Sequence, residues 1–222
     1  MQNFTTIFLI FGLFIFLFSL FLFVKEDFFF LRKNISLDEF FSLSFIIFFI
    51  ALFFSRFIFV IENFKIAYLS PLVFLALPYF PGLSFSGGLI SGFILLVLIT
   101  RRKNYPIKRI ADIFLLSFMI AFDTQLLLLA VVDLFYKNIF VLAAFIFLLI
   151  INIFVLLIFR NSKLKDGSVG YLSFIFLALT VFVAFYLQNI KEFIKNPVLE
   201  LFLLVIIIFF GFFMFIKNEY LD

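Results

Sequence analysis

The sequence predicts an all-α, polytopic integral membrane protein that forms a single domain over residues 1–222. Hydrophobic residues occupy 67% of the chain, and 45 positions are phenylalanine. Apolar runs recur along the chain, each near or above the roughly 17 residues that a helix needs to cross a bilayer. No internal repeat and no long polar linker divides these runs, so one helical domain is the simplest organisation.

Seven transmembrane helices account for the apolar runs. Pro71, Pro78 and Pro81 interrupt the stretch 66–80, and residues before proline avoid the helical region, so we expect a short interfacial or re-entrant piece there. The first span has no basic residue before it and no small-residue cleavage site after it, so we expect it to be retained. The predicted spans lie at about residues 4–24, 38–62, 83–99, 110–134, 139–159, 169–190 and 198–216.

The basic residues indicate how these spans are oriented. Twelve of the 17 fall on one side of a seven-span arrangement, and Arg56 lies within a span. Because Lys and Arg favour the cytoplasmic face, we expect the amino terminus outside and the carboxyl terminus inside. The net charge of +4 is then a topology signal, and no nucleic-acid partner is expected. The other side holds only Lys65, Lys137, Lys191 and Lys195.

Residue types that are absent from the chain exclude several kinds of chemistry. There is no cysteine, no histidine and no tryptophan. Disulfides, histidine bases and metal sites built from nitrogen and sulfur ligands are therefore excluded, and no carboxylate cluster at metal spacing replaces them. No Walker or dinucleotide-binding glycine pattern stands in a strand–turn–helix setting. We expect no metal and no cofactor.

The segment 81–92 is the most informative stretch, because it places four glycines and three serines at the mouth of an apolar span. Glycine inside a helix is unfavourable by about 1 kcal/mol relative to alanine, so the cluster indicates the close approach of another helix or a ligand. One interpretation is a helix contact through Gly88 and Gly92. The other is a lipid-binding site that includes Ser86, Gly87 and Gly88.

Arg56 and Asp123 are ionisable residues inside predicted spans, where a charge costs at least about 2.5 kcal/mol. Their depths differ by about 7 to 8 Å at 1.5 Å per residue, which a long arginine can bridge. One interpretation is a buried Arg56–Asp123 pair in the outer half of the membrane. In another, Arg56 snorkels toward the outer interface or toward Glu62. A separate interpretation makes Asp123, Thr124 and Gln125 a kinked or hydrated stretch that holds the fourth span against its neighbours through hydrogen bonds.

Asp112 follows the basic loop at 101–109. We expect it to be an interfacial charge that complements the positive end of its own helix dipole. The remaining polar residues of the spans are expected to lie at interfaces or helix contacts, and they are Asp133, Asn152, Thr180 and Gln188.

The segment Gly82–Gly92 resembles the G-L-x-F-H-G-G-L-x-x-G motif of the prolipoprotein diacylglyceryl transferases. An Arg-Arg-Lys loop, a proline and a helix that carries Ala111-Asp112 follow it in the family's order. Ser55–Val60 is similar to the family's G-A-R-x-x-Y-V helix, which puts Arg56 on a family arginine. Asp166–Val169 is similar to the family's P-G-x-V-F stretch, so the resemblance runs almost end to end.

This resemblance implies an activity and its partners. The family transfers a diacylglyceryl group from phosphatidylglycerol to the lipobox cysteine of a prolipoprotein, in the bacterial cytoplasmic (inner) membrane. The implied partners are phosphatidylglycerol or another anionic phospholipid and a prolipoprotein signal helix. Such a transfer needs a base for the thiol, a cation for the phosphate and a groove open to lipid. We expect Arg56 to bind the phosphate, Asp123 to serve as the base or orient it, and Ser86 with Gly87 and Gly88 to line the headgroup pocket.

The chain departs from the family at several motifs. Ser86 stands where the family has histidine, the G-R-x-G-N-F-x-N-x-E signature is missing after the fourth span, and the late Y-G-x-x-R-F-x-x-E motif keeps only its phenylalanine. A divergent transferase and a catalytically inactive relative that binds phospholipid or signal helices therefore both stay open. A small transporter is a weaker third interpretation, because inverted repeats and paired broken helices are not evident.

Overall fold

The computed structural model describes residues 2–25, 27, 30, 35–75, 82–134, 139–160, 164–188 and 198–221. Within these ranges the regular structure is helical, which confirms the all-α class. Two short turns accompany the α-helices, a 3₁₀ turn η1 (Ile66–Leu69) and a π-helical turn η2 (Lys217–Leu221). The α-helices are α1 (Gln2–Lys25), α3 (Leu37–Glu62), α4 (Pro71–Leu75), α5 (Phe85–Arg102), α6 (Ile107–Leu134), α7 (Ile139–Arg160), α8 (Ser168–Gln188) and α9 (Val198–Ile216).

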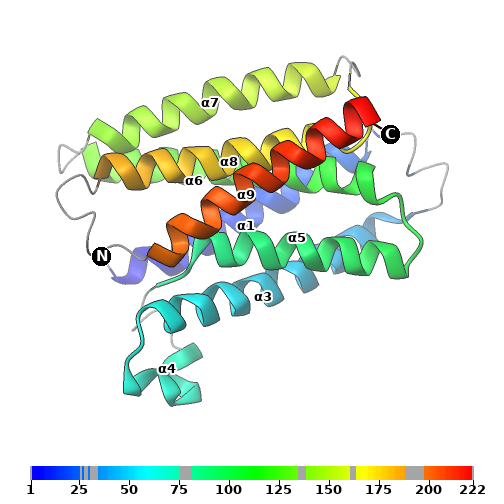
Figure 1. The fold of residues 1–222 in the computed structure, drawn as a ribbon. Helices are drawn as coiled ribbons and strands as arrows, with labels where there is room; N and C mark the ends of the chain where they lie inside the picture. Colours follow the sequence, from blue (N-terminus) through cyan, green and yellow to red (C-terminus); the bar gives the residue numbers. More distant parts are fainter. Residues whose placement is uncertain are drawn as a thin grey trace.

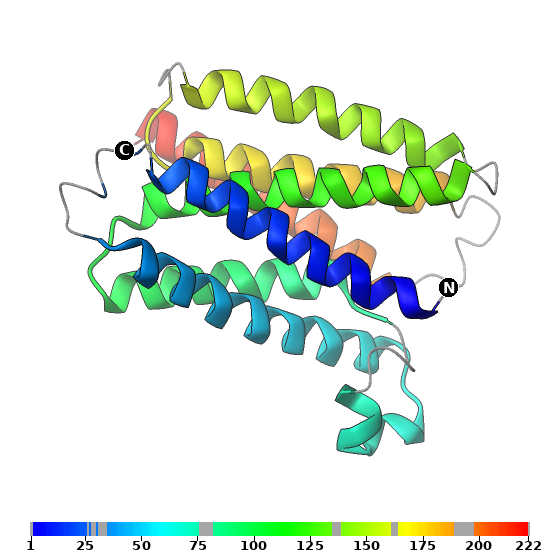
Figure 2. The same cartoon turned by 180° about the vertical axis from the view of Figure 1, so that it is seen from behind.

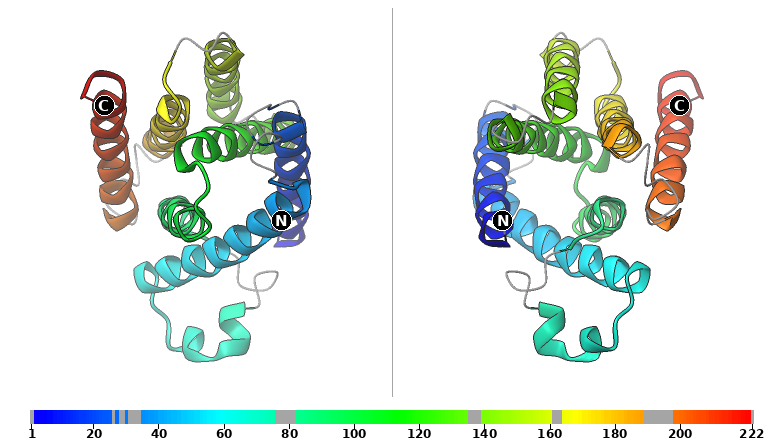
Figure 3. Two further views of the ribbon diagram at one scale, coloured as in Figure 1. Left: turned by 90° about the vertical axis from the view of Figure 1, so that its right-hand side faces the viewer. Right: turned by 90° about the vertical axis from the view of Figure 1, so that its left-hand side faces the viewer.

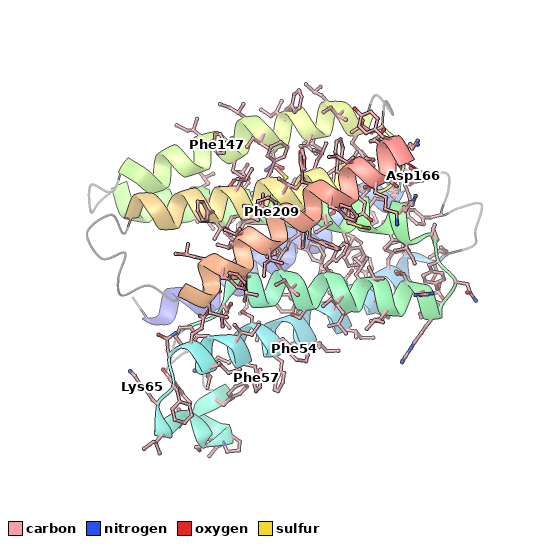
Figure 4. All side chains as sticks on the ribbon, viewed as in Figure 1. Phe54, Phe57, Lys65, Phe147, Asp166 and Phe209 are labelled. Atoms are coloured by element: carbon pink, nitrogen blue, oxygen red, sulfur yellow. The ribbon has the colours of Figure 1, made fainter. Side chains whose placement is uncertain are left out.

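The surface and the helix lengths fit a multi-pass membrane protein. Large aromatic side chains project outward from the bundle, among them Phe54, Phe57, Phe147 and Phe209, with exposed fractions between 42% and 71% (Figure 4). Such a surface is unfavourable in water and suits lipid. The number of passes and the outside amino terminus stay predictions. Among the described residues, four helical stretches are long and apolar enough to cross a membrane: Leu37–Glu62, Phe85–Arg102, Ile107–Leu128 and Leu199–Tyr220.

Helix α6 is the central element of the bundle. It packs against α1, α5, α7 and α8 (Figures 1 and 2). Its inward side chains Ile110, Ile113, Leu116 and Met119 have no exposed surface. Helix α3 pairs with α5, and α9 covers α8 and α5. Helix α1 begins at one end of the bundle and α9 ends at the other, which agrees with an odd number of passes (Figure 1).

Serine caps determine where two of the helices begin. The Ser36 hydroxyl accepts the Glu39 N–H at 3.3 Å, and the Glu39 carboxylate accepts the Ser36 N–H at 3.3 Å, which is the reciprocal capping box at the start of α3. The Ser84 hydroxyl accepts the Gly87 N–H at 3.1 Å at the start of α5. Helix α5 therefore begins at Phe85, two residues after the expected start of the span.

The proline-rich piece expected at 66–80 is described over its first ten residues. It forms η1 and α4, which lie on the side of α3 away from the rest of the bundle, and α4 contacts α3 at Phe53 and Arg56 (Figures 1 and 3). Positions 76–80 lie outside the described residues. Because α4 has only five residues, it is a turn of the connection between α3 and α5 and is too short to be a span.

Asp112 does not have the role that the sequence suggested. It lies within α6, is 1% exposed, and its carboxylate accepts the N–H groups of Gly167 at 2.7 Å and Gly170 at 2.5 Å. These donors open α8, so Asp112 complements the dipole of α8 and not that of its own helix. The prediction was wrong because a helix N-terminus from a distant part of the chain meets this carboxylate. Arg109 pairs with Asp166 at 3.2 Å at the same end of the bundle.

Candidate functional site

A cavity of about 540 Å³ lies between α1, α3, α5 and α6. Its wall is mostly apolar and includes several phenylalanines. The polar side chains of the wall come from Ser44, Ser55, Ser84 and Gln125. Ligand pockets in proteins commonly measure about 300 to 1,000 Å³ and combine an apolar wall with a few polar groups. The cavity is therefore suited to a ligand that is largely apolar.

Small residues bring α3 and α5 together beside this cavity. A Cβ atom on Gly88 would lie 3.3 Å from the Cβ of Ser55, and one on Gly92 would lie 3.5 Å from the Cβ of Ala51. The helix-contact interpretation of Gly88 and Gly92 is thus confirmed, and both glycines also line the cavity. Gly87 packs against Ile58, whose Cδ1 would lie 2.7 Å from an added Cβ.

Glu200 forms a buried polar cluster with Ser84 and Ser86 where α5 begins. The carboxylate is on a residue that is 2% exposed. Its Oε1 accepts the Ser86 N–H at 2.7 Å, and its Oε2 accepts the Ser86 hydroxyl at 2.8 Å and the Ser84 hydroxyl. The free N–H groups and the dipole of a helix N-terminus stabilise a carboxylate at this position. The cluster therefore ties the first turn of α9 to the first turn of α5.

Glu200 is a candidate residue that sequence reasoning missed. The available signal was an acidic residue in the first turn of an otherwise apolar helix. Ser86, by contrast, was predicted to face a lipid headgroup. The structure places it with no exposed surface and with its hydroxyl on Glu200.

Ser84 connects this cluster to the cavity. It belongs to the cavity wall, while its hydroxyl donates to Glu200. Its backbone is fixed on α3, because its N–H donates to the Ser55 carbonyl at 3.1 Å and its carbonyl accepts the Ser55 hydroxyl at 2.7 Å. A polar group with a defined orientation thus borders the apolar cavity.

Arg56 is buried at 1% exposure and is held by backbone carbonyls and aromatic rings. Its Nη1 donates to the Gly82 carbonyl at 2.7 Å, and its Nε donates to the Phe74 carbonyl at 3.1 Å. Its guanidinium carbon lies 5.4 Å from the ring centre of Phe59 and 5.2 Å from that of Tyr68. Among the described residues Nη2 has no hydrogen-bond partner. Arg56 therefore connects α3 both to α4 and to Gly82, which lies two residues before Ser84.

The predicted Arg56–Asp123 pair is not formed in the structure. Asp123 lies on α6, and its neighbour is Asn152 of α7. Helix α5 lies between α3 and α6, so two residues at similar depth do not face each other (Figure 3). The alternative in which Arg56 snorkels toward Glu62 is not observed either, because the guanidinium is buried and bonds to carbonyls. Catalytic roles for Arg56 and Asp123 stay predictions.

Comparison with known proteins gives one family match. The family model described as prolipoprotein diacylglyceryl transferase matches residues 4–124, which is more than half of the 222-residue chain. No curated protein matches the chain. The residues that line the cavity run from Gly12 to Gln125, so all but the last of them fall inside the matched region. Glu200 and Asn152 lie outside it.

Proposed function

We propose, because this chain belongs to the prolipoprotein diacylglyceryl transferase family, that it transfers a diacylglyceryl group from an anionic phospholipid to the lipobox cysteine of a prolipoprotein. Phosphatidylglycerol is the proposed donor and the bacterial cytoplasmic membrane the proposed location. The observation that carries the proposal is the cavity of about 540 Å³, which is built almost entirely by the part of the chain that matches the family.

The lining of the cavity supports a lipid as its occupant. Acyl chains gain about 25 cal/mol for each Å² of apolar surface removed from water, and the wall offers mostly apolar surface for this contact. Ser55 and Ser84 add polar atoms to one part of the wall, and we place the lipid headgroup next to it. Their hydroxyl protons are donated to the Ser84 carbonyl and to Glu200. In this proposal Gly88 contacts the lipid directly, while Ser86 and Gly87 support the start of α5.

An inactive relative that binds phospholipid or a signal helix is the second candidate function. Two observations favour it. The chain contains no histidine to act as a base. Arg56, which resembles a family arginine, already donates to two backbone carbonyls. An arginine that binds phosphate usually offers a pair of parallel N–H donors, and here Nη2 is the nitrogen left for it.

Complementation of a transferase-depleted bacterium tests the proposed activity. The chain is expressed, its presence in the membrane is confirmed, and a reporter lipoprotein is analysed by mass spectrometry for the addition of a diacylglyceryl group. A lipidated reporter is the expected result. An unmodified reporter would contradict the transfer, provided that an established transferase modifies the same reporter in parallel. Phospholipid bound to the purified chain would then select the second candidate.

A further inference from the structure

The proposed transfer to a cysteine sulfur needs a proton acceptor, because the thiolate is the nucleophile. Histidine is absent from the chain. Asp123 contacts Asn152 on α7 and does not belong to the cavity wall that the structure describes. The Glu200 carboxylate is connected to this wall through one side chain, because the hydroxyl of the wall residue Ser84 donates to it.

The hydrogen bonds around Ser84 orient its hydroxyl for proton transfer. A serine hydroxyl has one proton to donate and two positions at which it can accept. The proton is donated to Glu200 Oε2, and one acceptor position takes the Gly87 N–H at 3.1 Å. The Ser86 hydroxyl lies 3.3 Å away and donates its own proton to Glu200 at 2.8 Å. With the Ser86 proton on Glu200, the bonds among the described residues leave the second acceptor position of Ser84 without a proton, and we place the substrate's S–H there.

We infer that Glu200 receives the substrate's thiol proton through Ser84. Ser84 would touch the substrate and is the catalytic residue, whereas Glu200 acts through Ser84 and is the positioning residue. This inference rests on the proposed transfer. As the S–H proton passes to Ser84 Oγ, the Ser84 proton passes to Glu200. The sulfur electron pair forms the S–C bond to the glyceryl carbon of the phospholipid. The C–O bond to phosphate breaks, glycerol phosphate leaves with that electron pair, and Glu200 later returns the proton to solvent or product.

Both ends of the relay are held in place by the fold. Glu200 is fixed by the Ser86 N–H of α5, and the Ser84 backbone is fixed by Ser55 of α3. The nearby ionisable groups of α3 are Glu62, which interacts electrostatically with Glu200, and Arg56, which is bonded to backbone carbonyls. The relay therefore joins α3, α5 and α9 at the edge of the cavity.

Four variants test the inference in a purified transfer assay with phosphatidylglycerol vesicles and a lipobox peptide. Glu200→Gln and Ser84→Ala each remove the relay, and we expect kcat to fall at least about 100-fold, the lower range for loss of a general base. Ser173→Ala is the control, because Ser173 is a buried serine on α8 whose hydroxyl donates to the Val169 carbonyl at 2.9 Å and which does not belong to the cavity wall; we expect it to keep most of its activity. Glu200→Asp keeps an acid and is expected to restore part of the rate.

Lipid binding and the unfolding midpoint are measured on each variant, so that a folding defect is separated from a loss of proton transfer. Wild-type rates in Glu200→Gln, or equal losses in Ser84→Ala and Ser173→Ala, would overturn the inference while the proposed transfer stands. A wild-type chain that transfers nothing would overturn the proposed transfer and, with it, the relay.

Discussion

Replacement of Arg56 by alanine distinguishes a structural arginine from one that is free to bind lipid. The side chain donates to the carbonyls of Gly82 and Phe74 and stacks near two aromatic rings. A hydrogen bond from a charged group contributes about 1.5 to 3 kcal/mol, and an arginine over a ring about 0.5 to 2 kcal/mol. Because Gly82 and Phe74 are partly exposed, water can bond to their carbonyls in the variant and compensates for part of the lost hydrogen bonding. We expect Arg56→Ala to lower the free energy of unfolding by about 3 kcal/mol.

The assay for this change is reversible unfolding of the purified protein in mixed micelles, followed by circular dichroism as the fraction of denaturing detergent rises. Arg101→Ala is the control, because Arg101 is exposed in the last turn of α5, and we expect a change within about 0.5 kcal/mol. Arg56→Lys keeps the charge but replaces the planar fork that bridges two carbonyls, so an intermediate loss is expected. An Arg56→Ala variant with wild-type stability and weaker lipid binding would contradict a structural role for Arg56 and would favour Arg56 as a phosphate ligand.

Two further substitutions test the helix ends. Asp112→Asn removes the charge that accepts two N–H groups at the start of α8. In the same assay we expect the free energy of unfolding to fall by about 2 to 3 kcal/mol. The control is Asp166→Asn, at an exposed residue, for which we expect a fall of less than about 1 kcal/mol. Equal effects of the two changes would contradict the role of Asp112. Gly82→Ala places a Cβ 2.1 Å from the Phe59 ring at a residue whose φ is +145°, so we expect about 1 to 3 kcal/mol of destabilisation. Gly92→Ala, whose Cβ makes ordinary contacts, is the control, and the reasoning fails if both glycine variants are equally stable.

The helices are predictable because apolar runs and helices coincide in a membrane protein. A chain inside the bilayer must satisfy its backbone hydrogen bonds within the helix, so the run 198–216 and the helix Val198–Ile216 have the same bounds. Hydropathy does not predict where helix α5 ends. The helix continues through Arg101 and Arg102, because helical hydrogen bonding does not end where the apolar run ends.

The site is less predictable because its contacts join distant parts of the chain. The sequence shows that Glu200 lies in an apolar span, but its partners Ser84 and Ser86 are 116 and 114 residues away. The apolar pattern within one helix does not show which other helix packs against its end. Depth alone likewise suggested that Arg56 and Asp123 could pair, and the position of α5 between their helices prevents it.

Native mass spectrometry of the purified chain with phosphatidylglycerol measures whether a phospholipid occupies the cavity. Ala121 lines the cavity on α6, and Leu127 on the same helix is 42% exposed. We expect the wild-type chain and Leu127→Phe to retain a bound phospholipid. Ala121→Phe fills the cavity, so we expect it to lose the lipid, while its unfolding midpoint stays close to that of Leu127→Phe. A wild-type chain without bound lipid, or an Ala121→Phe variant that binds as the wild type does, would contradict the account.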